Sequence, residues 1–202
     1  MKILKEIWRA MWSSWERSLF LYALVRNLPG QYGFLLRKCL LIGKFGSTGT
    51  NIKIHEGFRF RQIHKIYLGD YINIGVDCFI QASGSLEIGD YTLIGPGVKI
   101  WTQNHITDST DIPIQKQGTE YKKIIIGRDC WIGSNAFIMP GAVLGDGIVV
   151  SAGAVVGAKQ YPPFAILAGN PARIIGMRTN NPHHNAMQKQ RKESQILSDV
   201  DS

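Results

Sequence analysis

His105 is the residue of this chain whose type and setting most directly suggest chemistry. It stands in the stretch WTQNHITD, Trp101 to Asp108, behind a regular pattern and ahead of a segment, residues 106–123, that has none. An imidazole accepts a proton near neutral pH and so can activate a weak nucleophile such as a hydroxyl group. Asn104 and Asp108 flank it, and either could hold the ring or line a site. The alternative is a histidine that only hydrogen-bonds to the following loop.

Metal and redox chemistry have weaker support in the sequence. A zinc site of three histidines would need partners for His105, and the repeats within residues 68–161 contain none. Cys39, Cys78 and Cys130 are widely spaced and form neither a Cys-x-x-Cys nor a Cys/His pattern. We therefore expect three reduced cysteines and no bound metal.

The elements that must position His105 are repeats of six residues. An aliphatic residue opens each repeat, the second residue is often glycine, and the fifth is small or β-branched. A period of six fits neither an α-helix nor an alternating strand. The first positions are Leu68, Ile74, Ile80, Ile88, Ile94, Ile100, Ile126, Ile132, Ile138, Leu144, Val150 and Val156, and the fifth positions include Thr92, Val98, Cys130, Ala136, Ala142 and Ala154.

This period predicts a solenoid in which each hexapeptide forms one short flat side and one corner. The aliphatic residue faces the interior and the small fifth residue packs beside it, so Cys78 and Cys130 should be buried. Glycine, asparagine and aspartate fall near the corners, where a positive φ costs them little. Three hexapeptides make one triangular coil, and a weaker first copy begins near Ile54.

The repeats also carry a family resemblance. The segments IGPGVKIWTQNH, IGRDCWIGSNAFIMPGAVLGDGIVVSAGAVV and PPFAILAGNPARIIG, all between Ile88 and Arg178, resemble the hexapeptide-repeat acyltransferases. Within that superfamily they are most similar to the O-acetyltransferases of sugars and bacterial surface polysaccharides. The resemblance implies an all-β solenoid, a left-handed parallel β-helix, with residues 106–123 as one extruded loop. It also implies that His105 is the catalytic base, that acetyl-CoA is the co-substrate, and that the protein is a homotrimer.

The resemblance further implies which residues bind the coenzyme. Gly133 and Ser134 in WIGS, and Ala152 in SAGA, match positions along a groove that lies between two subunits in the family. Lys159 and Arg173 match basic positions that meet the phosphates, a role that suits their charge. The stretch VVGAKQYPP is one residue longer than the common family form, and plain surface charge is the alternative for both basic residues.

For the acceptor, the resemblance points to aromatic residues. Trp131, at the sixth position of its repeat and therefore at a corner like that of His105, would offer an indole face to a sugar ring. Its alternative is packing between subunits. Trp101 and Tyr121 are further candidates for the acceptor site. The coil CFIQASGSLEIG lacks the Asn or Asp of many small-sugar relatives, which argues against a small galactoside or maltose as acceptor and leaves room for a larger or lipid-linked glycan.

These expectations predict an acetyl-CoA-dependent O-acetyltransferase that acts on a sugar hydroxyl in surface polysaccharide biosynthesis. His105 would be the general base in a direct ternary complex. The main alternative is an N-acetyltransferase of an amino sugar or a nucleotide-linked amino sugar. A zinc hydratase of the same fold and a non-catalytic scaffold are further alternatives from other classes.

The N-terminal region differs in character from the repeats. Trp8, Met11, Trp12, Trp15 and Leu19 recur at spacings of three and four, as on one face of a helix, and the turn at residues 28–30 divides the region into two helical pieces. One interpretation is an amphipathic anchor that makes peripheral contact with an anionic membrane, because most of the net charge of +8 lies here. The other is a cap that packs on the end of the solenoid or on another subunit.

We expect three parts: a helical extension (residues 1–45), the β-helix (46–178, with the loop 106–123) and a polar C-terminal tail (179–202). The charge is not gathered into an aromatic-studded basic stripe, so a nucleic-acid partner is not expected. No signal-peptide pattern and no apolar stretch of membrane-spanning length is evident. The expected location is the cytoplasm, with the inner face of the membrane as an alternative.

Overall fold

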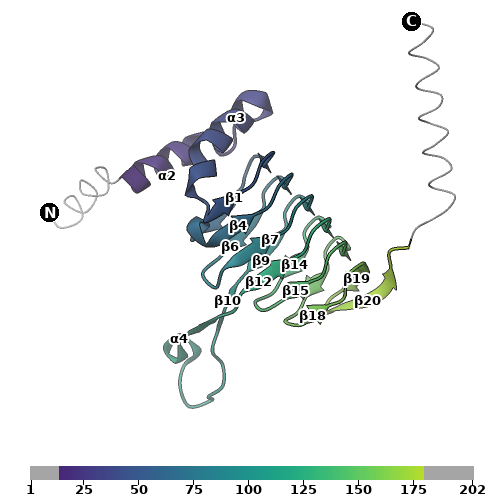
Figure 1. The fold of residues 1–202 in the computed structure, drawn as a ribbon. Helices are drawn as coiled ribbons and strands as arrows, with labels where there is room; N and C mark the ends of the chain where they lie inside the picture. The colour runs from purple at the N-terminus through teal and green to yellow at the C-terminus, as the bar shows by residue number, and fades with distance from the viewer. Residues whose placement is uncertain (1–13, 180–202) are drawn as a thin grey trace, which may run out of the picture.

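Residues 14–179 form a triangular parallel β-helix that is preceded by helices α2 (Ser14–Val25) and α3 (Gly30–Leu41) (Figure 1). The structure is a computed structural model and describes residues 14–179. The expected helical positions Trp8, Met11 and Trp12 and all but the first residue of the predicted tail lie outside the described residues, as does the side chain of Trp15.

Three sheets form the sides of the prism, and the chain visits them in the same order in every coil. Face A holds β1 (Ser47–Thr48), β4 (Ile66–Leu68), β7 (Leu86–Ile88), β12 (Ile124–Ile126), β15 (Val143–Leu144) and β18 (Gln160–Tyr161). Face B holds β2 (Lys53–Ile54), β5 (Asn73–Ile74), β8 (Leu93–Ile94), β13 (Trp131–Ile132), β16 (Val149–Val150), β19 (Ala165–Gly169) and β20 (Ala172–Met177). Face C holds β3 (Arg59–Arg61), β6 (Phe79–Gln81), β9 (Lys99–Trp101), β14 (Phe137–Ile138) and β17 (Val155–Val156).

Neighbouring coils pair in parallel on every face, and only the last pair of face B, β19 with β20, is antiparallel. We call the corners between the faces the A–B, B–C and C–A edges. Because a triangular prism has one edge opposite each face, face B lies opposite the C–A edge. The fold class predicted from the hexapeptide period and the resemblance is confirmed.

The aliphatic residues that open the hexapeptides form the core, as predicted. All are buried, and the most accessible of them, Leu68, is 4% exposed. The small fifth-position residues pack beside them, with Cys78 at 0% and Cys130 at 1% exposure. The one polar residue among them, Thr92, is also fully buried and donates its hydroxyl to the carbonyl of Gly127 at 3.0 Å. The interior is therefore filled with side chains, and any site must lie outside it.

The corners need residues with positive φ, but these are not always glycine, asparagine or aspartate. At the A–B edge successive coils place Asn51, Tyr71, Tyr91, Asp129, Gly147 and Phe164, all with positive φ. The rings of Tyr71 and Tyr91 stack at 4.9 Å with 7° between their planes, because equivalent corner residues of adjacent coils lie one above the other.

Helices α2 (Ser14–Val25) and α3 (Gly30–Leu41), followed by the 3-10 turn η1 (Ile42–Lys44), cover the first coil. Residues 26–29 connect α2 to α3, which overlaps the turn expected at residues 28–30. The Tyr22 hydroxyl donates to the Phe58 carbonyl at 2.6 Å, and the buried Arg37 donates through Nε to the carbonyl of Ile54 at 3.2 Å. These contacts show the capping role for the described part of the extension. No helix within residues 14–179 is long and apolar enough to cross a membrane.

The irregular segment after His105 is an ordered hairpin. Strand β10 (Gln103–His105) pairs antiparallel with β11 (Thr119–Tyr121), and the short helix α4 (Ile114–Gln117) lies between them. The hairpin leaves the solenoid at the C–A edge between β9 and β12 and projects sideways from it (Figure 1). The departure from the repeat thus begins at Gln103, three residues before the expected start of the loop. At the same edge of the first coil, η2 (Ile63–Lys65) forms the corner.

Candidate functional site

His105 lies at the base of the extruded hairpin and is exposed to solvent. In β10–β11, Gln103 pairs with Tyr121 and His105 with Thr119. Side chains alternate between the two sides of a strand. His105 and Tyr121 therefore share one side of the hairpin, and Asn104 is on the other.

Asn104 and Asp108, either of which could hold the ring or line a site by the sequence, do not hydrogen-bond to the imidazole. Asn104 accepts a hydrogen bond from the backbone N–H of His105 through Oδ1 at 3.0 Å, so it holds the main chain of the hairpin rather than the ring. Asp108 lies exposed in the loop, and within residues 14–179 no hydrogen bond joins it to His105. The ring is therefore free to meet a substrate.

Polar residues that the sequence analysis overlooked anchor the hairpin to the prism. Thr102, fully buried, donates its hydroxyl to the Gln81 carbonyl at 2.8 Å and accepts the N–H of Gly84 at 2.8 Å. The side chain of Gln81 donates to that of Gln103 at 3.1 Å. A buried threonine directly before the break in the hexapeptide frame was the available sequence signal. These bonds give His105 a rigid base, since a buried polar network with satisfied partners restricts motion.

Trp101 lies on face C beside the same C–A edge. Its ring is half-buried and packs edge-on against Phe79 at 5.1 Å and roughly parallel to Phe137 at 6.4 Å. This aromatic cluster forms the outer surface of face C next to the hairpin.

Trp131 occupies a different side of the molecule. The sequence placed it at a corner like that of His105, but it is the first residue of β13 on face B and is 56% exposed. The same position in a hexapeptide falls on different faces, because three successive hexapeptides complete one coil. Trp131 lines an open hollow of about 300 Å³ together with His55, Asn73 and Pro96, among others. The Oδ1 atom of Asn73 is buried there and accepts no hydrogen bond from the described residues.

The predicted coenzyme residues are also spread over more than one edge. Gly133, Ser134 and Ala152 follow the strands of face B and lie along the B–C edge. A Cβ on Gly133 would come within 2.6 Å of the Ala152 nitrogen, so only glycine allows this close stacking of the two coils. Lys159 lies at the C–A edge with Nζ 5.0 Å from the centre of the Tyr161 ring, and Arg173 is on β20 at the C-terminal end of face B.

One copy of the chain therefore separates the predicted residues into two groups. His105, Tyr121, Trp101 and Lys159 lie on or next to the C–A edge, whereas Trp131, Ser134 and their neighbours lie on face B and the B–C edge. The two groups lie on different sides of a filled prism, and His105 and Trp131 on opposite ones. They can form one site only between two copies, with the C–A edge of one copy facing face B of the next.

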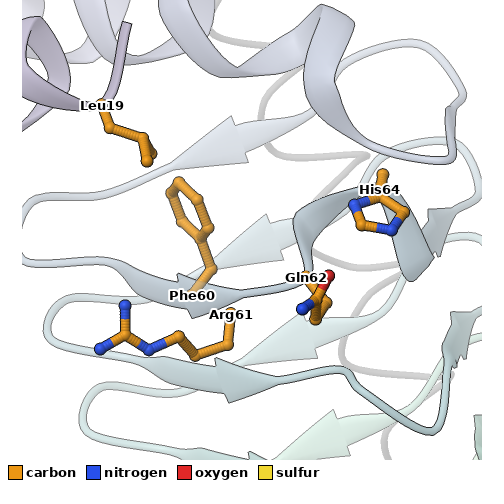
Figure 2. Close-up of a pocket in the computed structure, with 5 residues that line it drawn as sticks. All are labelled: Leu19, Phe60, Arg61, Gln62 and His64. Carbon is orange, nitrogen blue, oxygen red and sulfur yellow. The ribbon is translucent and has the colours of Figure 1, made fainter. Parts of the chain in front are cut away.

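A larger hollow, of about 430 Å³, lies between α2 and the first coil. Leu19, Phe60, Arg61, Gln62 and His64 line it, and Figure 2 shows Phe60 pointing toward Leu19 while Arg61 and His64 end on opposite sides of the view. Its polar groups do not converge on a common point. Among the described residues, no group of three or more His, Cys, Asp or Glu side chains is placed to hold a metal ion.

Comparison with known proteins identifies what the chain is similar to. The family described as "Hexapeptide repeat of succinyl-transferase" matches residues 123–158. The chain is 31% identical over 142 residues to the Escherichia coli (strain K12) protein named "Putative colanic acid biosynthesis acetyltransferase WcaF", covering 70% of this chain and 75% of that protein. It is 29% identical over 161 residues to galactoside O-acetyltransferase of the same strain, covering 79% of this chain and 77% of the other.

A solved structure agrees with these sequence relatives. It is a hexapeptide-repeat-containing acetyltransferase from Vibrio cholerae O1 biovar eltor in complex with acetyl coenzyme A. It aligns with a TM-score of 0.71 at 29% identity, covering 81% of this chain and 86% of that one.

Proposed function

The chain belongs to the hexapeptide-repeat acetyltransferases, and we propose that it transfers the acetyl group of acetyl-CoA to a sugar hydroxyl in surface polysaccharide biosynthesis. The observation that carries the proposal is His105, an exposed imidazole on a rigidly anchored hairpin at the edge of the prism. The names of the relatives, one for colanic acid and one for galactosides, support a sugar as the acceptor.

His105 acts as the general base in this mechanism. A neutral ring nitrogen takes the proton of the acceptor hydroxyl while its oxygen forms a bond to the thioester carbonyl carbon. The tetrahedral intermediate collapses by breaking the carbon–sulfur bond, and the imidazolium returns the proton to the departing thiolate of coenzyme A. The transfer is direct in a ternary complex, so no acyl-enzyme forms. Asn104 contributes by holding the His105 backbone.

The complete site lies between two copies in a homotrimer. His105 of one copy faces Trp131 of the partner subunit, whose exposed indole is a platform for a sugar ring. The open hollow beside Trp131 supports this placement, because it leaves space for a sugar ring next to the exposed indole. A cyclic assembly with a repeated interface supplies one such site per copy.

The pantetheine arm of acetyl-CoA lies along the B–C edge in this proposal. Gly133 and Ser134 lie on one coil of this edge and Ala152 on the next, and Gly133 lets the two coils stack closely there. Arg173, and Lys159 of a neighbouring copy, meet the phosphates at the outer end.

The test is a thiol-release assay with acetyl-CoA and a panel of hydroxyl and amino acceptors. His105→Ala should lower turnover by about a hundredfold or more while coenzyme binding by calorimetry persists. His64→Ala removes another exposed imidazole of the same edge and should leave turnover close to that of the unmodified protein. Near-full activity of His105→Ala would refute the base assignment. Acetylation of amino acceptors alone would replace O-transfer with N-transfer.

A further inference from the structure

Helices α2 and α3 contact the solenoid through one side of each helix. Tyr22 of α2 bonds to Phe58, Arg37 of α3 bonds to Ile54, and Leu41 at the end of α3 is fully buried. The residues on the opposite sides of both helices therefore face away from the β-helix.

Those opposite sides are apolar on both helices. On α2, Phe20, Leu21 and Leu24 follow one another at spacings of one and three and are 66%, 49% and 62% exposed. On α3, Tyr32, Leu35 and Leu36 are 85%, 52% and 45% exposed, and Leu28 in the connection is 42% exposed. We call these seven residues the outward helical surface. Single exposed apolar residues are common, but seven large ones on one pair of helices mark an interaction surface.

The charge around this surface is mainly positive, with Glu16 in the first turn of α2 as the exception. No Asp or Glu occurs between Arg17 and His55. Arg17 lies one turn before Phe20 and Leu21 on α2, and Arg26 and Lys38 follow on the connection and on α3. The acidic residue that follows in the sequence, Glu56, lies 3.7 Å from the buried Arg37, so it offsets that charge rather than the outer ones.

We propose that the outward helical surface docks the protein on an anionic phospholipid bilayer, with the two helices lying in the interface. An apolar helix face flanked mainly by basic residues is typical of such interfacial helices. A second copy of the same surface is a poorer partner, because it would bring like charges together as the apolar residues met. This surface is separate from the His105 edge, so the proposal does not depend on acetyl transfer.

Co-sedimentation of the full chain with vesicles tests the proposal. Phosphatidylcholine vesicles containing about one third phosphatidylglycerol should bind the protein, and pure phosphatidylcholine should bind it at least about tenfold less, because each basic residue near an anionic leaflet adds attraction. Raising the salt from about 0.1 M to about 1 M should release much of it, since the Debye length falls from about 10 Å to about 3 Å.

Two pairs of variants separate the apolar and the charged contributions. Leu24→Gln/Leu35→Gln should lower binding about tenfold or more, whereas Ile112→Gln/Ile114→Gln, with 49% and 53% exposure on the extruded loop, should not change it. Arg17→Gln/Arg26→Gln should lower binding to the anionic vesicles by a similar factor, and the matched pair Lys99→Gln/Lys116→Gln should have little effect. Glutamine retains helix propensity close to that of leucine and arginine, so α2 and α3 should persist in circular dichroism.

Three results would overturn the proposal. The first is equal binding to both kinds of vesicle. The second is loss of binding in Trp8→Gln/Trp12→Gln together with full binding of Leu24→Gln/Leu35→Gln, which would move the contact to residues before α2. The third is a change in oligomeric state of Leu24→Gln/Leu35→Gln without vesicle binding by the unmodified chain, which would identify the surface as a contact between copies.

Discussion

Two impaired variants of this protein should restore each other's activity if the site is shared between copies. His105→Ala removes the proposed base at the C–A edge, and Trp131→Ala removes the exposed indole on face B. Neither residue supports the core: His105 is exposed, and the Trp131 side chain points out of a face whose inward position is filled by Ile132. Both variants should therefore fold and assemble.

The size of the recovery follows from the placement of the two residues. In a cyclic assembly of randomly mixed copies in equal amounts, about one quarter of the interfaces join an intact His105 to an intact Trp131. Loss of the base leaves about one hundredth of the rate. Loss of an aromatic platform worth about 1.4 kcal/mol leaves about one tenth. The mixture should then show slightly more than about one quarter of the normal rate, against about one twentieth if both residues acted within one copy.

A second mixture controls for changes in assembly. The double variant His105→Ala/Trp131→Ala combined with the unmodified chain leaves about one quarter of the interfaces intact for a shared site, but about one half for a site within one copy. Mixed assemblies are obtained by co-expressing the two chains in equal amounts and purifying them through one tag common to both, without selecting for mixed species. Rates are measured by thiol release at subsaturating acceptor. A rate near one half in the second mixture, with no recovery in the first, would refute the shared site.

Two further predictions concern stability. Burial raises the pKa of the Cys78 and Cys130 thiols from 9.0 to about 11, so the native state keeps protons that the unfolded chain releases. The free energy of unfolding should therefore be constant below about pH 9. It should fall between about pH 9 and pH 11, by up to about 2–3 kcal/mol per thiol. Urea unfolding at about pH 8 and about pH 10.5 measures this fall, and Cys130→Ala should remove its share; an unchanged pH dependence in that variant would contradict the cause. Tyr22→Phe removes the hydrogen bond to the Phe58 carbonyl and should lower the free energy of unfolding by about 1–2 kcal/mol. The control Tyr32→Phe, at a residue that is 85% exposed, should change it by less than about 0.5 kcal/mol. Equal effects of the two variants would refute the anchoring role of Tyr22.

The core of the fold was predictable because each inward position is set by local chain geometry. An aliphatic residue such as Ile132 or Val150 recurs every six residues, and the stacking of coils places the aliphatic residue of one coil over that of the next. The corners were less predictable. Tyr71 and Tyr91 take the positive φ expected of glycine or asparagine, and their mutual stacking at 4.9 Å depends on a residue of another coil. A contact between coils is not visible in the pattern of either hexapeptide alone.

The break in the repeat at His105 was predictable from the sequence, whereas the division of the candidate residues between faces was not. The break after His105 was evident from the lost period, but the pairing of Gln103 with Tyr121 was not, since the intervening segment carries no alternating pattern. The expectation that Trp131 lies at a corner like that of His105 was wrong. The two residues share a position within the hexapeptide, but their hexapeptides belong to different faces of the prism. The buried bonds of Thr102 were missed for a related reason, because they depend on Gln81 of the preceding coil.

The position of the N-terminal helices gives the proposed membrane contact a consequence for the acceptor. The helices cover the first coil, and the hairpin with His105 leaves the prism between β9 and β12. Along face A this level falls between β7 and β12, which lie two and three strand spacings from β1. At about 4.8 Å per spacing, His105 would lie roughly 10–15 Å beyond the first coil along the prism axis. A sugar linked directly to a headgroup would fall short of this height, whereas the outer residues of a lipid-linked glycan would reach it. With the prism axis perpendicular to the bilayer, the proposed contact would therefore suit an acceptor of several sugar units on a lipid carrier. The rate with a short soluble galactoside should then respond to neither vesicles nor the Leu24→Gln/Leu35→Gln change.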